Sequence, residues 1–180
     1  MSADRSLLLI SGSVRAGSTN AAVLTTATLV LPEGVSATIY DGLARLPHFN
    51  PDDDVEPLPP AVAELRAAIA SADAIVFSTP EYAGALPGSF KNLLDWTVGG
   101  GEIYEKPVAW INVATSPTGA ANAYESLRIV LGYAGTRIVD AACAHIPVPH
   151  ALVDERGLVA DATVKEQVAH VITTLVASLD

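Results

Sequence analysis

The chain has 180 residues, half of them hydrophobic and 17% charged, which is the opposite of the balance found in disordered segments. We therefore expect a folded protein in which residues 1–180 form one domain. The formal net charge of −10 leaves no basic footprint for nucleic acid. Apolar runs fall short of the roughly 20 residues that cross a bilayer, and the short apolar run from Leu7 is no secretory signal. These features predict a cytoplasmic protein with neither nucleic-acid partners nor membrane insertion.

The first half of the chain alternates strands and helices around one long loop. We expect strands over residues 6–11, 35–40 and 72–80, and helices over residues 20–31, 60–71 and 90–98. The loop over residues 41–59 is rich in Pro and Asp and is longer than a simple connection needs. It is therefore either functional or poorly ordered.

The second half continues the alternation, with strands over residues 107–116 and 136–146 and helices over residues 119–135 and 161–179. Five strands that alternate with helices predict an α/β fold, a parallel sheet with helices on both faces. Ligands of such sheets bind beyond the carboxyl ends of the strands. Three stretches share that edge and form one candidate site: a first loop (Ser11–Asn20), a second loop (Thr79–Ser89) and a third loop (Thr115–Gly119).

The first loop, SGSVRAGSTN, places hydroxyls, glycines and one cation between a strand and a helix. Ser18, Thr19 and Asn20 are helix-capping residue types, but a cap leaves Ser13 and Arg15 unexplained. A helix N-terminus with added hydroxyls and a guanidinium can bind phosphate. Ser18 stands where a triphosphate-binding loop has Lys, so a terminal monophosphate fits better. Taken alone, the loop fits either a phosphate site or a plain capped turn.

The second loop contains TPEYAGALPG, a stretch of small residues around one aromatic side chain. Tyr82 offers a ring face for stacking, and the small Ala83 and Gly84 let a flat ligand approach the backbone. Glu81 is either a catalytic acid or a carboxylate that organises backbone or faces solvent. The second interpretation is favoured, because no partner for Glu81 lies nearby in the sequence.

The pair GSVRAGSTN and TPEYAGALPGSFKNLLDW resembles the NADPH-dependent FMN reductase family of flavodoxin-like proteins, whose relatives include quinone, azo-dye and chromate reductases. The likeness extends from residue 6 to about residue 145 and includes LPHFNPDDD, ADAIVFSTPEY and EKPVAWINVATS. It implies a flavodoxin-like three-layer sandwich with strand order 2-1-3-4-5, one FMN per subunit, and a homodimer, with a tetramer as the alternative. At position 83 the family often has Asn, where this chain has Ala.

The resemblance also assigns roles to residues in all three loops. Those that would hold the FMN phosphate are Ser13, Arg15, Ser18, Thr19 and Asn20. Those that would line the isoalloxazine ring are Pro80, Glu81, Tyr82, Ala83 and Gly84. Those that would cover its other edge or the ribityl chain are Ser116, Pro117, Thr118 and Gly119.

These roles imply an enzyme, an FMN-dependent NAD(P)H oxidoreductase. Electrons would pass from NADPH or NADH to the flavin, and then to a quinone, a free flavin or a similar small-molecule acceptor, in ping-pong fashion. The flavin carries the chemistry, so we expect no catalytic side chain. Two alternatives stay open: an FMN-binding electron carrier or redox sensor without significant turnover, and a flavin-free phosphate-binding domain.

The remaining chemistry-bearing residues predict neither a metal site nor a nucleophile. Metal-ligand spacing is absent among the histidines, which are His48, His145, His150 and His170. The run Asp52–Asp54 favours a solvated turn. Cys143 lies in an apolar stretch, which favours a buried thiol over a nucleophile.

Overall fold

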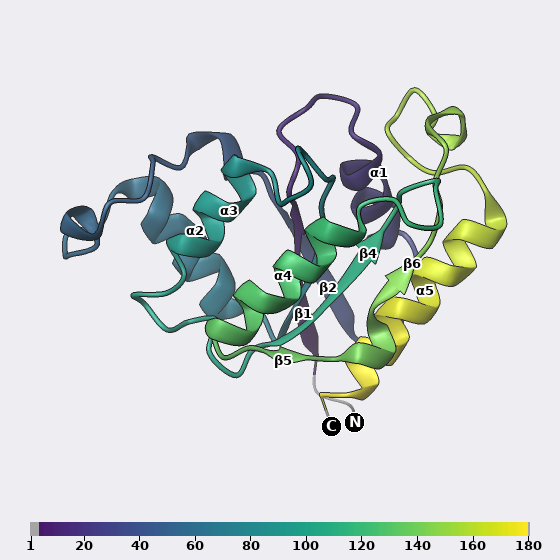
Figure 1. The fold of residues 1–180 in the computed structure, drawn as a ribbon. Coiled ribbons are helices and arrows are strands. Elements are labelled where there is room, and N and C mark those ends of the chain that lie inside the picture. The colour runs from purple at the N-terminus through teal and green to yellow at the C-terminus, as the bar shows by residue number, and fades with distance from the viewer. Residues whose placement is uncertain (1–3, 180) are drawn as a thin grey trace.

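The computed structural model describes residues 4–179, which fold around a parallel sheet (Figure 1). The strands are β1 (Arg5–Ser11), β2 (Val35–Tyr40), β3 (Ala74–Ser78), β4 (Pro107–Asn112), β5 (Arg137–Ile138) and β6 (Ala144–His145). The α-helices are α1 (Thr19–Ala27), α2 (Pro60–Ser71), α3 (Gly88–Asp95), α4 (Ala121–Tyr133) and α5 (Ala162–Ala177). Short 3-10 turns occur at Leu43–Arg45, Pro51–Asp53, Asp140–Ala142 and His150–Leu152.

The strands follow the order β2-β1-β3-β4-β5, and β6 also pairs with β4. This order confirms the predicted fold class and the predicted sequence of strands in the sheet. Every pair of neighbouring strands is parallel. The carboxyl ends of β1, β3 and β4 therefore meet at one edge, and the three loops leave the sheet there (Figure 1).

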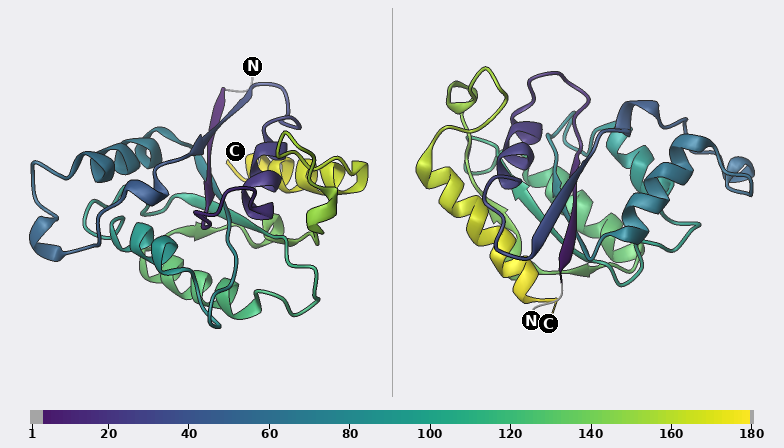
Figure 2. Two further views of the ribbon diagram at one scale, coloured as in Figure 1. Left: turned by 90° about the horizontal axis from the view of Figure 1, so that it is seen from above. Right: turned by 180° about the vertical axis from the view of Figure 1, so that it is seen from behind.

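Helices cover both faces of the sheet, as the view from above in Figure 2 shows. α1 and α5 pack on one face, and α2, α3 and α4 pack on the other. In β1, Leu7 and Leu9 join the core under α1 and α5, whereas Leu8 and Ile10 join the opposite core. Because both faces of the strand are buried, its sequence is a continuous apolar run and not an alternation.

The prediction of one continuous fifth strand over residues 136–146 is wrong. The chain forms β5, turns through the 3-10 segment at Asp140, and only then forms β6. An ion pair between Arg128 of α4 and Asp140, with Nη2 2.6 Å from Oδ1, holds the turn. Ala142 is buried in the core that α5 covers. β5 and β6 consequently pair with separate parts of β4.

Other element boundaries also differ from prediction. β4 ends at Asn112 instead of residue 116, because the Asn112 side chain accepts a hydrogen bond from Ala114 N and turns the chain. α1 ends at Ala27, and the Thr28 hydroxyl donates to the carbonyl of Thr25 at 2.7 Å in its last turn. α3 begins at Gly88, directly after a proline, and ends at Asp95.

The long loop over residues 41–59 is fixed in place by α3. Asn92 of α3 accepts from Phe49 N at 2.7 Å and donates to the carbonyl of Pro47 at 2.8 Å. The indole of Trp96 donates to the same carbonyl at 2.9 Å. These bonds place the loop beside the first loop of the candidate site, with which it shares a pocket.

The same loop is also tied to α2 through a buried arginine. Arg66 of α2 bonds to Asp54 Oδ1 at 2.6 Å and to the carbonyl of Trp96 at 2.9 Å. The prediction of a solvated Asp52–Asp54 turn is therefore wrong for Asp54, whose side chain is only 13% exposed. The other two carboxylates of that run are exposed.

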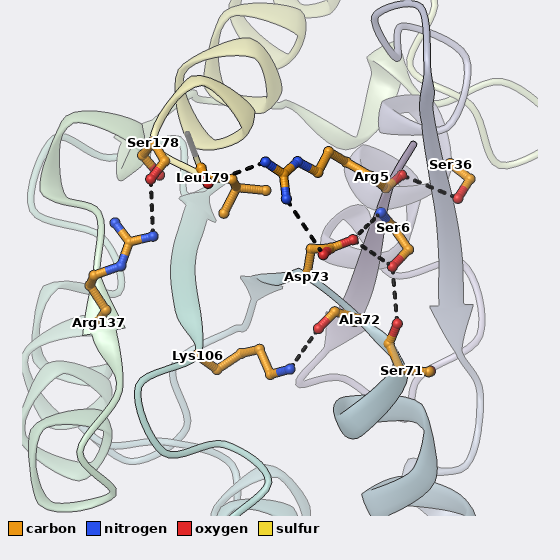
Figure 3. Close-up of polar contacts among 10 residues, drawn as sticks. All are labelled: Arg5, Ser6, Ser36, Ser71, Ala72, Asp73, Lys106, Arg137, Ser178 and Leu179. Atoms are coloured by element: carbon orange, nitrogen blue, oxygen red, sulfur yellow. Dashed lines mark hydrogen bonds and ion pairs between the residues drawn. The ribbon is translucent and has the colours of Figure 1, made fainter. Parts of the chain in front are cut away.

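A polar cluster closes the opposite, amino-terminal edge of the sheet (Figure 3). Asp73, just before β3, accepts from Ser6 N at 2.7 Å and from Ser6 Oγ at 2.9 Å. The backbone hydrogen bond from Ser6 is the main cause of a lowered pKa of the Asp73 carboxyl. Arg5 and Arg137 donate to the carbonyls that follow α5. The cluster fixes β1 against β3 and anchors the last helix.

We expect the substitution Asp73→Ala to lower the free energy of unfolding by about 1 kcal/mol at pH 7, the typical net value of a hydrogen bond. Because the pKa of Asp73 is lowered in the folded state, this stabilisation is present above the unfolded-state pKa and is lost as the pH falls through the folded-state pKa. Urea unfolding of wild type and variant at neutral and acid pH measures the difference.

The control is Asp52→Ala, because the exposed Asp52 carboxylate makes no bond within residues 4–179. A stability difference for Asp73→Ala that is absent at pH 7, or that persists unchanged in strong acid, would contradict this assignment.

Candidate functional site

A pocket of about 390 Å³ opens at the carboxyl edge of the sheet. The start of α1, the ends of β3 and β4, and the segments that follow these strands form its walls. Each of the three predicted loops contributes to the lining. The predicted site residues within it are Thr19, Asn20, Pro80 and Glu81. The other predicted residues lie outside the lining, on the loops that surround it.

The first loop runs from the end of β1 to the start of α1. Gly12 packs so closely on β3 that a Cβ would lie 2.3 Å from Thr79 Oγ1, so no larger residue fits there. Ser18 occupies the N-cap position, but its hydroxyl makes no capping bond. The Ser13 hydroxyl accepts from Arg15 N at 3.3 Å. The helix start therefore keeps its first amides free of side-chain caps.

Arg15 differs from every other arginine in the part of the chain that the structure describes. Its side chain is exposed and makes no hydrogen bond or ion pair within residues 4–179. Each remaining arginine contacts a carboxylate or a backbone carbonyl; these are Arg5, Arg45, Arg66, Arg128, Arg137 and Arg156. Arg15 thus supplies an uncompensated positive charge next to the positive end of α1.

Asn20 supplies a buried polar group to the pocket. It is 7% exposed, and its Oδ1 accepts from the Ser78 hydroxyl at 2.9 Å. Its Nδ2 has no partner in the described part of the chain, although the residue lines the pocket. Because Asn20 lines the pocket, this free amide group can donate to a ligand that brings an acceptor.

The second loop turns back on itself in a tight hairpin. Tyr82 and Ala85 exchange backbone hydrogen bonds of 3.0 and 3.1 Å. Between them, Ala83 and Gly84 both have left-handed backbone, with φ values of 51° and 72°. Two such residues are typical of a type I′ turn, in which Asn-Gly is preferred, so Ala83 carries about 1 kcal/mol of strain. The hairpin leaves the Tyr82 side chain 52% exposed at its base.

Glu81 is engaged with the backbone of the neighbouring helix. Its Oε2 accepts from Ala123 N, in the first turn of α4, at 3.0 Å. A carboxylate at a helix N-terminus is stabilised by the helix dipole. This contact confirms the interpretation of Glu81 as a carboxylate that organises backbone, and it ties the second loop to the helix that follows the third.

The third loop reaches the pocket through Thr115, and its four predicted site residues follow outside the lining. Ser116, Pro117 and Thr118 are exposed, and Gly119 is half-buried. A Cβ on Gly119 would lie 2.6 Å from the Cβ of Ala114, so the loop closes tightly on itself.

Sequence reasoning missed several lining residues, among them Asn112, Ala114, Val148 and His150. Asn112 could have been found from the sequence, because it is a polar residue at the end of a buried strand. No such signal existed for His150. Its segment reaches the pocket because Val148 N bonds to the carbonyl of Val113 at 3.0 Å, a contact that follows from the break between β5 and β6.

Three further observations limit the chemistry. Across residues 4–179, no cluster of three or more His, Cys, Asp or Glu side chains is arranged to hold a metal ion. Within the same range, no helix combines the length and apolar character needed to cross a membrane. Burial raises the pKa of the Cys143 thiol to about 11. Cys143 is half-buried instead of fully buried as expected, and its thiol is protonated at neutral pH, unlike that of an activated nucleophile.

Comparison with known proteins places this geometry in a family. Residues 6–150 match the model of the NADPH-dependent FMN reductase family. An NAD(P)H-dependent FMN reductase of Pseudomonas aeruginosa is 38% identical over 133 residues, which is 73% of this chain and 71% of that protein. A probable NADPH:quinone oxidoreductase of rice (Oryza sativa) is 28% identical over 171 residues, or 92% of this chain and 84% of that protein.

A solved structure resembles nearly the whole chain. The flavoenzyme NAD(P)H:acceptor oxidoreductase of Paracoccus denitrificans superposes with a TM-score of 0.84 at 25% identity, covering 97% of both chains. The match of the family model to most of the chain, the strand order and the bacterial relative agree with one another. This chain belongs to the NADPH-dependent FMN reductase family.

Proposed function

We propose that the chain is an FMN-dependent oxidoreductase that passes electrons from NADPH or NADH to a quinone, a free flavin or a similar small-molecule acceptor by a ping-pong mechanism. The observation that carries the proposal is the unpaired Arg15 beside the start of α1, in a chain of net charge −10. We further propose that residues 1–180 act as one FMN-binding domain, in the cytoplasm and as a homodimer.

The first loop would hold the FMN phosphate. Arg15 supplies the charge, because a guanidinium can bond two phosphate oxygens at once. The hydroxyls of Ser13, Ser18 and Thr19 and the free amides at the start of α1 add neutral donors. Asn20 adds its unpartnered Nδ2. The residues present therefore suit a phosphate monoester on a protein that otherwise repels anions.

The second and third loops would hold the flavin ring. Pro80 and Glu81 form the wall of the pocket, and Tyr82 offers an open ring face. Ala83 and Gly84 keep the backbone accessible to a flat ligand. The third loop would cover the remaining edge of the ring or the ribityl chain with Ser116, Pro117, Thr118 and Gly119.

The chemistry of the reaction would come from the cofactor. FMN, when bound, supplies hydride acceptance from the nicotinamide and electron transfer to the acceptor. The protein's own task is to bind and orient, which agrees with the engagement of Glu81 by the backbone of α4. A pocket of about 390 Å³ is in the range for one ligand of cofactor size. Nicotinamide and acceptor would then use the exposed face in turn, which favours a ping-pong order.

The proposal is tested by purifying the protein, saturating it with FMN and mixing it with NADPH or NADH in a stopped-flow spectrometer. We expect a yellow protein whose flavin absorption bleaches rapidly and returns when a quinone or free flavin is added. Protein that stays colourless after incubation with FMN would refute a flavin function and leave a phosphate-binding domain. Slow bleaching with both nicotinamides would instead indicate a carrier or a sensor.

We expect Arg15→Ala to weaken FMN binding by about 1.5–3 kcal/mol, the range for hydrogen bonds to charged groups, because no other described cation is free beside the first loop. Ser13→Ala should cause a smaller loss. Quenching of flavin fluorescence gives both affinities. Riboflavin, which lacks the phosphate, should bind wild type and Arg15→Ala equally.

The matched control is Arg156→Ala, an exposed arginine paired with Asp154 away from the pocket. An FMN affinity of Arg15→Ala that equals that of wild type and of this control would rule out Arg15 as the phosphate anchor.

A further inference from the structure

The third loop is closed by a single side chain at its base. Asn112, the last residue of β4, accepts from Ala114 N at its Oδ1, at 3.0 Å, and donates from its Nδ2 to the carbonyl of Gly119 at 2.9 Å. The residue is 9% exposed and forms part of the pocket lining. One buried amide therefore joins the two ends of the loop.

Further contacts remove the remaining freedom of this loop. His145 of β6 bonds through Nε2 to the carbonyl of Ala114 at 2.6 Å, so both peptide groups of Ala114 are fixed. Gly119 N donates to the carbonyl of Ser116 at 2.9 Å. Ala120, which follows, has a left-handed φ of 58°, a conformation that a non-glycine residue keeps only when its surroundings impose it.

This closure leaves a set of free donors on the third loop, whose Thr115 lines the pocket. The backbone N–H groups of Thr115, Ser116 and Thr118 have no partner within residues 4–179, and all three residues are exposed. Donors that are fixed before a ligand arrives bind it without an ordering cost. The value of these amides to a ligand therefore depends on the bonds that Asn112 makes.

We propose that Asn112 is a positioning residue for the flavin: it holds the third loop in the shape that directs these free amides at the ring or the ribityl chain. The inference rests on the proposed function. Oδ1 and Nδ2 of Asn112 each make a bond inside the loop, so removing the side chain releases both ends of the loop. Substitution of Asn112 should weaken the binding of the ring and the ribityl chain, whereas substitution of Arg15 should weaken the binding of the phosphate.

This separation makes the test specific. Apo-protein is titrated with FMN and with riboflavin, for wild type, Asn112→Ala and Arg15→Ala. We expect Asn112→Ala to raise the Kd of both flavins about tenfold, since both carry the ring and the ribityl chain. Arg15→Ala should raise the Kd of FMN alone. Visible-region circular dichroism at saturating FMN should change in Asn112→Ala and stay unchanged in Arg15→Ala.

Hydrogen exchange reports the loop without any flavin. The Ala114 amide, protected by Asn112 in wild type, should exchange faster in Asn112→Ala and keep its protection in Asn112→Asp, which retains the Oδ1 acceptor but loses the donor to Gly119. Because Asn112→Asp also adds a negative charge that repels the FMN phosphate, the two variants are compared with riboflavin, whose binding Asn112→Asp should weaken less than Asn112→Ala does. Asn112→Asp also serves as the second variant if the alanine protein fails to fold.

The matched control is Asn50→Ala, since Asn50 also accepts from a backbone amide two residues on, in the loop over residues 41–59. It should leave both flavin affinities unchanged. Unaltered affinities in Asn112→Ala despite faster exchange of Ala114 would overturn the inference and leave the proposed function intact. Wild type that binds neither flavin would overturn both.

Discussion

The candidate site depends on a buried hydrogen-bond network at the carboxyl end of β3. Ser78 is completely buried, so its hydroxyl must find partners inside the protein. It donates to Asn20 at the start of α1 and lies 2.8 Å from the carbonyl of Ile111 in β4. The Tyr124 hydroxyl of α4 donates to the same carbonyl and accepts from Thr79 N. Four elements are thereby joined at one point, and each loop of the site leaves from a fixed position.

Bonds next to this network accompany unusual backbone in the second loop and at the end of the third loop. Burial raises the pKa of the Tyr124 hydroxyl far above its usual range, so the hydroxyl is protonated and can donate at neutral pH. The left-handed conformations of Ala83 and Ala120 lie in the loops on either side of this tyrosine. Each costs about 1 kcal/mol in isolation, and both are retained because Glu81 and Asn112 hold the flanking backbone.

Local sequence predicted what depends on neighbours in the chain. The apolar run of β1 and the grouping of three loops at one edge are of this kind, whereas the strand order came from the family resemblance. The break between β5 and β6 was not predictable, because it depends on Ala142 packing into the core under α5 while the two strands pair with separate parts of β4. The burial of Asp54 likewise depends on its ion pair with Arg66. The loop closure by Asn112 depends on its bond to the carbonyl of Gly119, seven residues away. Contacts between elements, and not propensities, decided these features.

The distribution of charge gives the site its direction. A net charge of −10 disfavours any anionic ligand at long range, so binding has to rest on local donors. Most cations are neutralised by carboxylates or carbonyls, and the free guanidinium of Arg15 lies at one end of the candidate site, on the first loop. At the other end the donors are uncharged amides on the third loop. Under the proposed function, a ligand with one charged terminus and one neutral, hydrogen-bonding end would therefore bind with its charged terminus toward Arg15 and its neutral end toward the third loop.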